Sequence, residues 1–136
     1  MQSTDILKPN TDEIPSAYAD RLGLHYSSVV TQVHKKENGQ FFTPTEIAHF
    51  MASLSNIQSQ SIRILDPGCG TAVLTCALIE RLVYENKNLK EVEFIGYETD
   101  ADLIPFSEAS LINLRNWLIG KGIEAKHFLH ENDFIL

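Results

Sequence analysis

Residues 62–72 read Ile-Arg-Ile-Leu-Asp-Pro-Gly-Cys-Gly-Thr-Ala. The apolar run ends in Asp66, two glycines follow in a short loop, and a helix-forming segment begins at Val73. This order predicts a strand, a tight loop and a helix, the opening unit of a nucleotide-binding α/β fold. The glycines let the backbone approach a ligand, because no Cβ intervenes. Free N–H groups at the start of the helix face the same ligand.

The spacing of small residues in this loop favours one class of cofactor. A dinucleotide fingerprint, Gly-x-Gly-x-x-Gly, would need its third glycine at Val73. The alternative frame, acid-x-Gly-x-Gly-x-small, fits Asp66, Gly68, Gly70 and Ala72, and it is similar to the loop of S-adenosylmethionine-dependent methyltransferases. An acid beside the loop suits an ammonium group better than a diphosphate. An ordinary turn that binds no ligand is the alternative.

A second apolar run, residues 92–97, also ends in acids. In nucleotide-binding α/β units, the acid that follows the second strand accepts hydrogen bonds from the ribose hydroxyls. Glu98 is therefore the ribose candidate, and as a loop-edge acid it is expected to contribute little to stability. Asp100 is the expected cap of the next helix. The polar residues 85–90 are expected to form a surface loop between the two motifs.

Upstream, residues 39–44 read Gly-Gln-Phe-Phe-Thr-Pro. Thr43 is expected to cap a helix, with Pro44 in its first turn and Glu46 completing a capping box. The apolar residues of this helix recur at helical spacing and are expected in the core. They are Ile47, Phe50, Met51 and Leu54.

Four segments in this order resemble the N6-adenine DNA methyltransferases in which the cofactor half precedes the catalytic half. They are residues 39–44, residues 66–72, Gly-Tyr-Glu at 96–98 and Asn-Asp-Phe at 132–134. Such domains occur in type I restriction–modification subunits and in fused type II restriction–methylation enzymes. The resemblance covers the chain from about Tyr26 to its end, and it implies S-adenosyl-L-methionine as the cofactor.

The resemblance also implies a role for each motif. The segment with Phe42 and Thr43 would close over the methionine end of the cofactor, and the loop after the first strand would hold the methionine amino group. Glu98 would hold the ribose, while Asp133 would contact the exocyclic amine of the adenine and Phe134 would pack against the ring. The candidate cofactor-binding residues are Phe42, Thr43, Asp66, Gly68, Cys69, Gly70, Glu98, Asp133 and Phe134.

The chain departs from the family at the catalytic step. The family's catalytic loop, Asn/Asp-Pro-Pro-aromatic, holds the extruded adenine. Prolines occur here only at positions 9, 15, 44, 67 and 105, and no two are adjacent. No catalytic residue is therefore expected in residues 1–136, which should be inactive alone. Ala72, where the family more often has glycine, is a mild change.

The amino-acid composition agrees with the cofactor-binding part of such a methyltransferase. The net charge of −7 has the wrong sign for a surface that grips DNA phosphates, so DNA binding is expected through regions outside these residues. Cys69 is expected to present its backbone to the ligand, with a reactive thiol as the alternative. The two cysteines and five histidines form no metal motif. Neither a membrane span nor a signal peptide is predicted, and the expected location is cytoplasmic.

The sequence thus predicts a three-layer α/β fold, the front half of a doubly wound Rossmann-like methyltransferase. Residues 1–38 form an N-terminal helical segment, helical over 16–36 with a break at Gly23, and residues 39–136 form a partial methyltransferase domain. Strands are expected at 62–65, 92–97 and 125–130, and helices at 43–56, 71–84 and 101–119.

The predicted function is the S-adenosylmethionine-binding part of a site-specific DNA adenine-N6 methyltransferase in a restriction–modification system. One alternative is a stand-alone cofactor-binding or protein-interaction module without chemistry. Another is a methyltransferase that acts on RNA, protein or small molecules. The sequence predicts no oligomeric state.

Overall fold

A computed structural model describes residues 6–30 and 43–135. Its centre is a sheet of three parallel strands in the order β1-β2-β3: β1 (Ser61–Asp66), β2 (Glu91–Tyr97) and β3 (Glu124–His130). Helix α4 (Val73–Glu85) connects β1 to β2, and α5 (Ile104–Gly120) connects β2 to β3. The carboxyl ends of the strands therefore meet at one edge, where Asp66 lies opposite Gly96.

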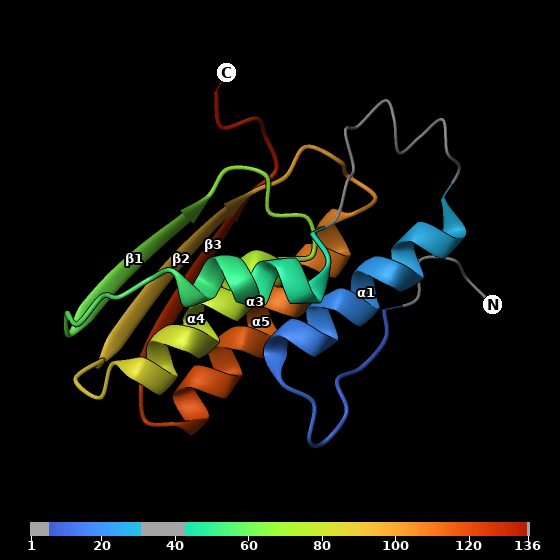
Figure 1. The fold of residues 1–136 in the computed structure, drawn as a ribbon. Helices are drawn as coiled ribbons and strands as arrows, with labels where there is room; N and C mark the ends of the chain where they lie inside the picture. Colours follow the sequence, from blue (N-terminus) through green and yellow to red (C-terminus); the bar gives the residue numbers. More distant parts are fainter. Residues whose placement is uncertain (1–5, 31–42, 136) are drawn as a thin grey trace.

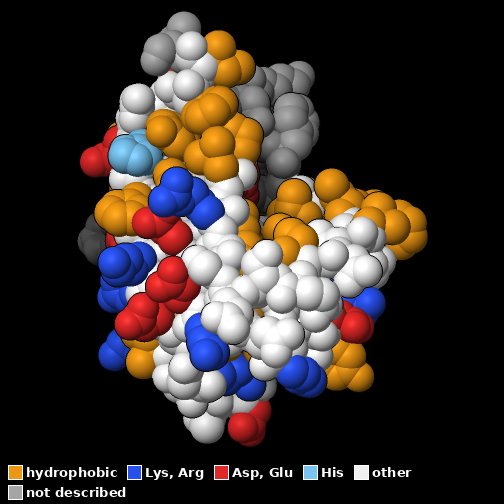
Figure 2. All heavy atoms as spheres, turned by 90° about the vertical axis from the view of Figure 1, so that its left-hand side faces the viewer, with side chains coloured by type: hydrophobic (Ala, Val, Ile, Leu, Met, Phe, Trp, Pro, Cys, Tyr) orange, Lys and Arg blue, Asp and Glu red, His pale blue; other side chains and the backbone are white. Residues whose placement is uncertain are grey.

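All the described helices lie on one face of the sheet (Figure 1). Ile62, Val92 and Phe94 point toward them and are buried. The alternate residues point to the other face, which Figure 2 shows, and there Leu65 and Phe128 are 46% and 47% exposed. The predicted α/β order is confirmed, but the described residues form only two of the three expected layers.

The first helix, α1 (Pro15–Val29), packs against α4 and α5. It passes through Gly23 without interruption, so the predicted break is wrong; Gly23 is buried, where its lack of a side chain permits close packing. A carboxylate from α4 holds the start of this helix. Glu80 accepts hydrogen bonds from the Ser16 N–H at 2.7 Å and the Ser16 hydroxyl at 2.8 Å, and its burial raises its pKa.

Helix α3 (Thr45–Ser53) begins later than predicted, and the predicted capping box is wrong. Pro44 occupies the capping position, and its carbonyl accepts the first helical hydrogen bond, from the Ala48 N–H at 3.0 Å. No side chain caps this helix. Thr43 lies one residue too far upstream to serve as the cap, and it lines a pocket instead.

The apolar side of α3 is also not in the core. The helix is buried through its small residues Ala48 and Ala52, which allow it to approach α4 closely. The larger residues therefore face outward, with exposed fractions of 52% for Ile47, 67% for Phe50, 45% for Met51 and 73% for Leu54. The prediction that these four residues lie in the core is wrong. Helical periodicity identifies an apolar side of the helix, but it does not say which element, if any, packs against that side.

The structure also differs from the predictions for Asp100 and for the loop at residues 85–90. Helix α5 begins after Leu103, and Asp100 does not cap it. The Asp100 carboxylate instead accepts the Asp102 N–H at 3.0 Å, which closes the turn before the helix. The loop at residues 85–90 is anchored rather than wholly at the surface, because buried Asn86 donates to the Ser59 carbonyl at 2.7 Å.

Among the described residues, no helix has the length and apolar character needed to cross a membrane. The same residues contain no group of histidine, cysteine, aspartate and glutamate side chains that could hold a metal ion.

Candidate functional site

A pocket of about 80 Å³ lies at the carboxyl end of β1, beside the loop that leads into α4. Open α/β sheets bind ligands at this edge. Five of the predicted cofactor residues line the pocket: Thr43, Asp66, Gly68, Cys69 and Gly70. The other lining residues are Thr71 of the loop and, from the first turn of α4, Val73 and Leu74.

The loop reaches this shape through two left-handed backbone conformations. Gly70 has a φ of 54° and Ala72 a φ of 66°. An alanine in this region is strained by about 1–2 kcal/mol, which explains why glycine suits the position better. The loop closes through a hydrogen bond from the Ala72 N–H to the Cys69 carbonyl at 2.7 Å. A Cβ at Gly68 would meet no atom within 4 Å, so the backbone there is open to a ligand.

Asp66 is held in place at the pocket by the chain around it. Its Oδ2 accepts the Thr75 hydroxyl at 2.9 Å, and its Oδ1 lies 3.4 Å from the Gly68 nitrogen. The carboxylate remains partly exposed. Thr75 was not predicted as a site residue, although its position in the first turn of the following helix is a signal for such a contact.

Glu98 is joined to the same loop by hydrogen bonds to the backbone. Its Oε1 accepts the Gly70 N–H at 3.1 Å, and its Oε2 accepts the N–H groups of Thr99 at 3.1 Å and Asp100 at 3.0 Å. The residue is only 9% exposed. The two acids predicted from separate motifs are thus brought to one loop, where Asp66 lies beside Gly68 and Glu98 accepts the Gly70 N–H.

Helix α5 supports the loop through a residue that sequence reasoning missed. The Ser107 hydroxyl donates to the Gly70 carbonyl at 2.5 Å and lies 3.3 Å from the Leu103 carbonyl. Ser107 is fully buried. A serine inside an apolar helix carries no specific signal, because the contact depends on tertiary structure.

Cys69 has a structural position in the loop. Its N–H donates to the Tyr97 carbonyl at 2.9 Å, and its sulfur lies against Gly96 of β2. Burial, followed by the negative charges of Asp66 and Glu98, raises the pKa of the Cys69 thiol to about 12. The thiolate that reactive cysteines need is therefore disfavoured, contrary to the alternative of a reactive thiol.

The thiols are expected to be unreactive in the folded protein. Cys76 is also free and buried, and burial raises its pKa as well. Ellman's reagent at pH 8 should modify neither cysteine within minutes, and should modify both in denaturant. Rapid modification of Cys69 in the folded protein would contradict the buried position.

Asp133 and Phe134 are not among the residues that line this pocket. Phe42 lies outside the described residues. Asp133 is exposed and accepts the Ile135 N–H at 2.9 Å. Phe134 is 46% exposed and meets the Tyr97 ring edge-on, with the ring centroids 5.1 Å apart. The structure therefore groups six of the nine candidates at the loop after β1, while Asp133 and Phe134 follow β3 and Phe134 packs on Tyr97, the residue before Glu98.

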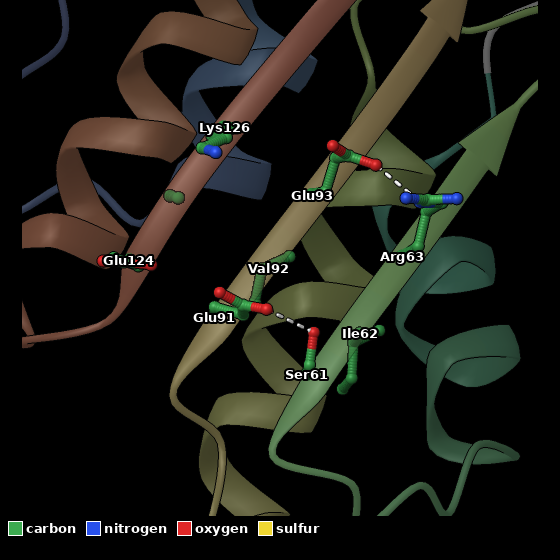
Figure 3. Close-up of a pocket in the computed structure, with 9 residues that line it drawn as sticks. Ser61, Ile62, Arg63, Glu91, Val92, Glu93, Glu124 and Lys126 are labelled. Carbon is green, nitrogen blue, oxygen red and sulfur yellow. Dashed lines mark hydrogen bonds and ion pairs between the residues drawn. The ribbon is translucent and has the colours of Figure 1, made fainter.

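A second pocket, of about 110 Å³, lies on the open face of the sheet near the amino ends of the strands (Figure 3). Polar pairs cross between the strands there. Arg63 lies 2.5 Å from Glu93, and the Ser61 hydroxyl donates to Glu91 at 2.7 Å. This is the end opposite to the one where such sheets bind ligands, and it contains none of the predicted site residues.

Comparison with known proteins shows the family of this chain. The family model described as N-6 DNA Methylase matches residues 18–130. The chain belongs to this family. The predicted resemblance to the N6-adenine DNA methyltransferases is thereby confirmed.

Two curated relatives are a type II methyltransferase and the methylase subunit of a type I restriction enzyme. The type II methyltransferase M.BsuBI of Bacillus subtilis is 35% identical over 86 residues, which are 62% of this chain and 17% of that protein. The type I restriction enzyme MjaIX methylase subunit of Methanocaldococcus jannaschii is 24% identical over 92 residues, 68% of this chain and 16% of that subunit. This chain thus corresponds to about a sixth of the length of each relative.

Two solved structures share the fold. A Listeria monocytogenes protein described as a class I S-adenosylmethionine-dependent methyltransferase superposes with a TM-score of 0.59 at 22% identity, over 86% of this chain and 32% of that one. A Vibrio vulnificus protein described as a modification subunit of a type I restriction enzyme superposes with a TM-score of 0.51 at 21% identity, over 87% and 24%. The predicted fold class is confirmed over this part of its length.

Proposed function

We propose that this chain is the S-adenosylmethionine-binding part of a site-specific DNA adenine-N6 methyltransferase of a restriction–modification system. The observation that carries the proposal is that both acids meet the backbone of the same loop, Asp66 beside the Gly68 nitrogen and Glu98 at the Gly70 N–H. An exposed carboxylate oxygen suits an ammonium group, and a second, nearly buried carboxylate suits ribose hydroxyls. Residues 39–136 would carry these motifs, and residues 1–38 would form the helical segment beside them.

The residues fit the two polar ends of the cofactor. Asp66, oriented by Thr75, would accept hydrogen bonds from the methionine ammonium group. Gly68 would let the backbone approach it, since no atom lies within 4 Å of a Cβ built there. A carboxylate has about four acceptor positions and Glu98 uses three, which leaves capacity for a ribose hydroxyl. The family resemblance assigns Phe42 and Thr43 to the methionine end and Asp133 and Phe134 to the adenine.

The bound cofactor would supply a methyl group activated by its sulfonium. The residues of this chain would bind and orient it, which is the contribution that positioning makes to a transfer reaction. The pocket of about 80 Å³ is smaller than the roughly 300–1,000 Å³ that enclose a ligand of this size. It would therefore hold one end of the cofactor, with further walls supplied from elsewhere.

We further propose that residues 1–136 alone transfer no methyl group. The sequence has no Pro-Pro pair to form the loop that holds an extruded adenine. Parallel sheets are normally covered on both faces, whereas residues 6–30 and 43–135 cover only one face, and the apolar side of α3 is also exposed. These features support the assignment to one part of a larger domain.

Cofactor choice is the direct test. We expect isothermal titration to detect binding of S-adenosylhomocysteine and no binding of NAD, because Asp66 suits an ammonium group and Val73 replaces the third dinucleotide glycine. Glu93→Ala, which alters an acid on the open face of the sheet, is the control and should bind like the unaltered chain. Tighter binding of NAD than of S-adenosylhomocysteine would overturn the cofactor assignment.

Methyl transfer is the second test. With labelled S-adenosylmethionine and DNA, the 136-residue chain should form no N6-methyladenine and should retard no DNA at moderate salt, because its charge is −7. Activity should appear when a polypeptide that contains the Asn/Asp-Pro-Pro-aromatic loop and a DNA-recognition domain is supplied. Methylation by the chain alone, in fractions that gel filtration shows to be free of a second protein, would contradict this division of labour.

A further inference from the structure

Three hydrogen bonds set the orientation of Glu98, and two of them come from the residues that follow it. The N–H groups of Thr99 and Asp100 both donate to Oε2, at 3.1 and 3.0 Å. The position of this carboxylate therefore depends on where the backbone of residues 99–100 is held. Any contact that holds Asp100 in place therefore also holds the Glu98 carboxylate.

Hydrogen bonds hold both the side chain and the backbone carbonyl of Asp100. Its side chain accepts the Asp102 N–H at 3.0 Å and the hydroxyl of Tyr26. Its carbonyl accepts the N–H groups of Leu103 at 3.0 Å and Ile104 at 3.2 Å. At 4% exposure its carboxylate faces the protein interior rather than the pocket. Asp100 thus connects the loop after β2 to α1, which lies 74 residues earlier in the sequence.

Tyr26 is itself held firmly. It is 2% exposed, and its ring meets Phe106 of α5 edge-on with centroids 5.3 Å apart. Both belong to an apolar cluster between α1 and the start of α5, separate from the core beneath the sheet: Tyr18, Leu22, Tyr26, Leu103 and Phe106. Buried tyrosines of this kind combine apolar packing with a directed hydroxyl group.

We propose that Tyr26 is a positioning residue for the cofactor site, which acts through Asp100 to hold the Glu98 carboxylate where it receives the ribose. This inference rests on the proposed function. Tyr26 does not touch the cofactor in this arrangement. It fixes the turn whose N–H groups orient the acid, so α1 contributes to the site without lining it.

The test compares two tyrosines of the same helix. Tyr26→Phe keeps the ring and removes the hydroxyl that reaches Asp100. Tyr18→Phe is the matched control, because Tyr18 is also 2% exposed, lies in the same cluster and donates its hydroxyl to the Leu7 carbonyl at 2.6 Å. Calorimetric titration with S-adenosylhomocysteine should give an affinity about three- to tenfold weaker for Tyr26→Phe, the size of one hydrogen bond. Tyr18→Phe should bind like the unaltered chain.

Two further measurements distinguish a role of Tyr26 in positioning Glu98 from a general loss of stability. With a 2′-deoxyribose analogue of S-adenosylhomocysteine, Tyr26→Phe should lose less affinity than with the ribose ligand. Without ligand, amide hydrogen exchange at Thr99 and Asp100 should become about tenfold faster in Tyr26→Phe and remain unchanged in Tyr18→Phe.

Equal amide exchange rates in Tyr26→Phe and Tyr18→Phe would overturn the role of Tyr26. So would an equal loss of affinity by Tyr26→Phe for the ribose and the 2′-deoxyribose ligands. If the unaltered chain does not bind S-adenosylhomocysteine, the proposed function is wrong. The ligand-free exchange rates then still decide whether Tyr26 holds the turn around Glu98.

Discussion

Glu98→Ala is expected to weaken the binding of S-adenosylhomocysteine by about 10- to 100-fold. The proposed ribose contact is one charge-assisted hydrogen bond, worth about 1.5–3 kcal/mol, and about 1.4 kcal/mol corresponds to a factor of ten. The substitution should also lower the free energy of unfolding by about 2–3 kcal/mol, because it removes the acceptor of three N–H groups in a nearly buried position. Titration and urea unfolding measure the two effects.

Glu93→Ala provides the control for this variant. Glu93 lies on β2, the strand that precedes Glu98, faces the open side of the sheet and pairs with the exposed Arg63 at 2.5 Å. Such ion pairs contribute about 0–1 kcal/mol, so its removal should change stability little and affinity not at all. An affinity for Glu98→Ala equal to that of the unaltered chain, at a temperature where circular dichroism shows it folded, would exclude Glu98 as the ribose acid.

The effect on stability differs from the expectation drawn from sequence. Glu98 follows a strand, and such an acid is expected to contribute little to the fold. In the structure it holds the loop after β1 to the loop after β2. Sequence position identified the residue, but one of its three stabilising hydrogen bonds comes from Gly70, which lies 28 residues away in the sequence.

The strands could be predicted because their signals are local. Apolar runs bounded by acids and glycines gave 62–65, 92–97 and 125–130, against observed strands at 61–66, 91–97 and 124–130. The surroundings of α3 could not be predicted in this way. Helical spacing selected Phe50 and Leu54 as core residues, whereas the close contact with α4 uses Ala48 and Ala52.

The same distinction holds at the site. Asp66, Gly68 and Gly70 belong to one short loop, and their grouping in a pocket follows from that local motif. Ser107 and Tyr26 reach the site across 37 and 74 residues of sequence. Their contacts depend on how α5 and α1 pack, and neither residue belongs to a motif. Long-range hydrogen bonds that support a loop are therefore the part of this site that sequence reasoning misses.

Gly96→Ala is expected to displace the cofactor loop. A Cβ at Gly96 would lie 2.9 Å from the sulfur of Cys69 and 3.2 Å from its Cβ, and both residues are buried. Overpacking of this kind costs about 1–3 kcal/mol, measured by urea unfolding. Because Cys69 is joined to Gly68 and Gly70, the shift should also disturb the Gly70–Glu98 hydrogen bond and weaken the binding of S-adenosylhomocysteine. Gly120→Ala is the control, since a Cβ there meets no atom within 4 Å.

A double substitution tests this explanation further. In Cys69→Ala combined with Gly96→Ala, the new methyl group takes the space that the sulfur leaves. The double variant should be more stable than Gly96→Ala alone, with a coupling energy of about 0.5–3 kcal/mol. Rescue should be incomplete, because the contact of 3.2 Å between the two Cβ positions remains. Strictly additive losses would show that the steric contact between loop and strand is not what makes glycine necessary at this position. A positive coupling accompanied by recovered affinity would mean that the spacing between β2 and the loop after β1 sets the geometry of the cofactor site.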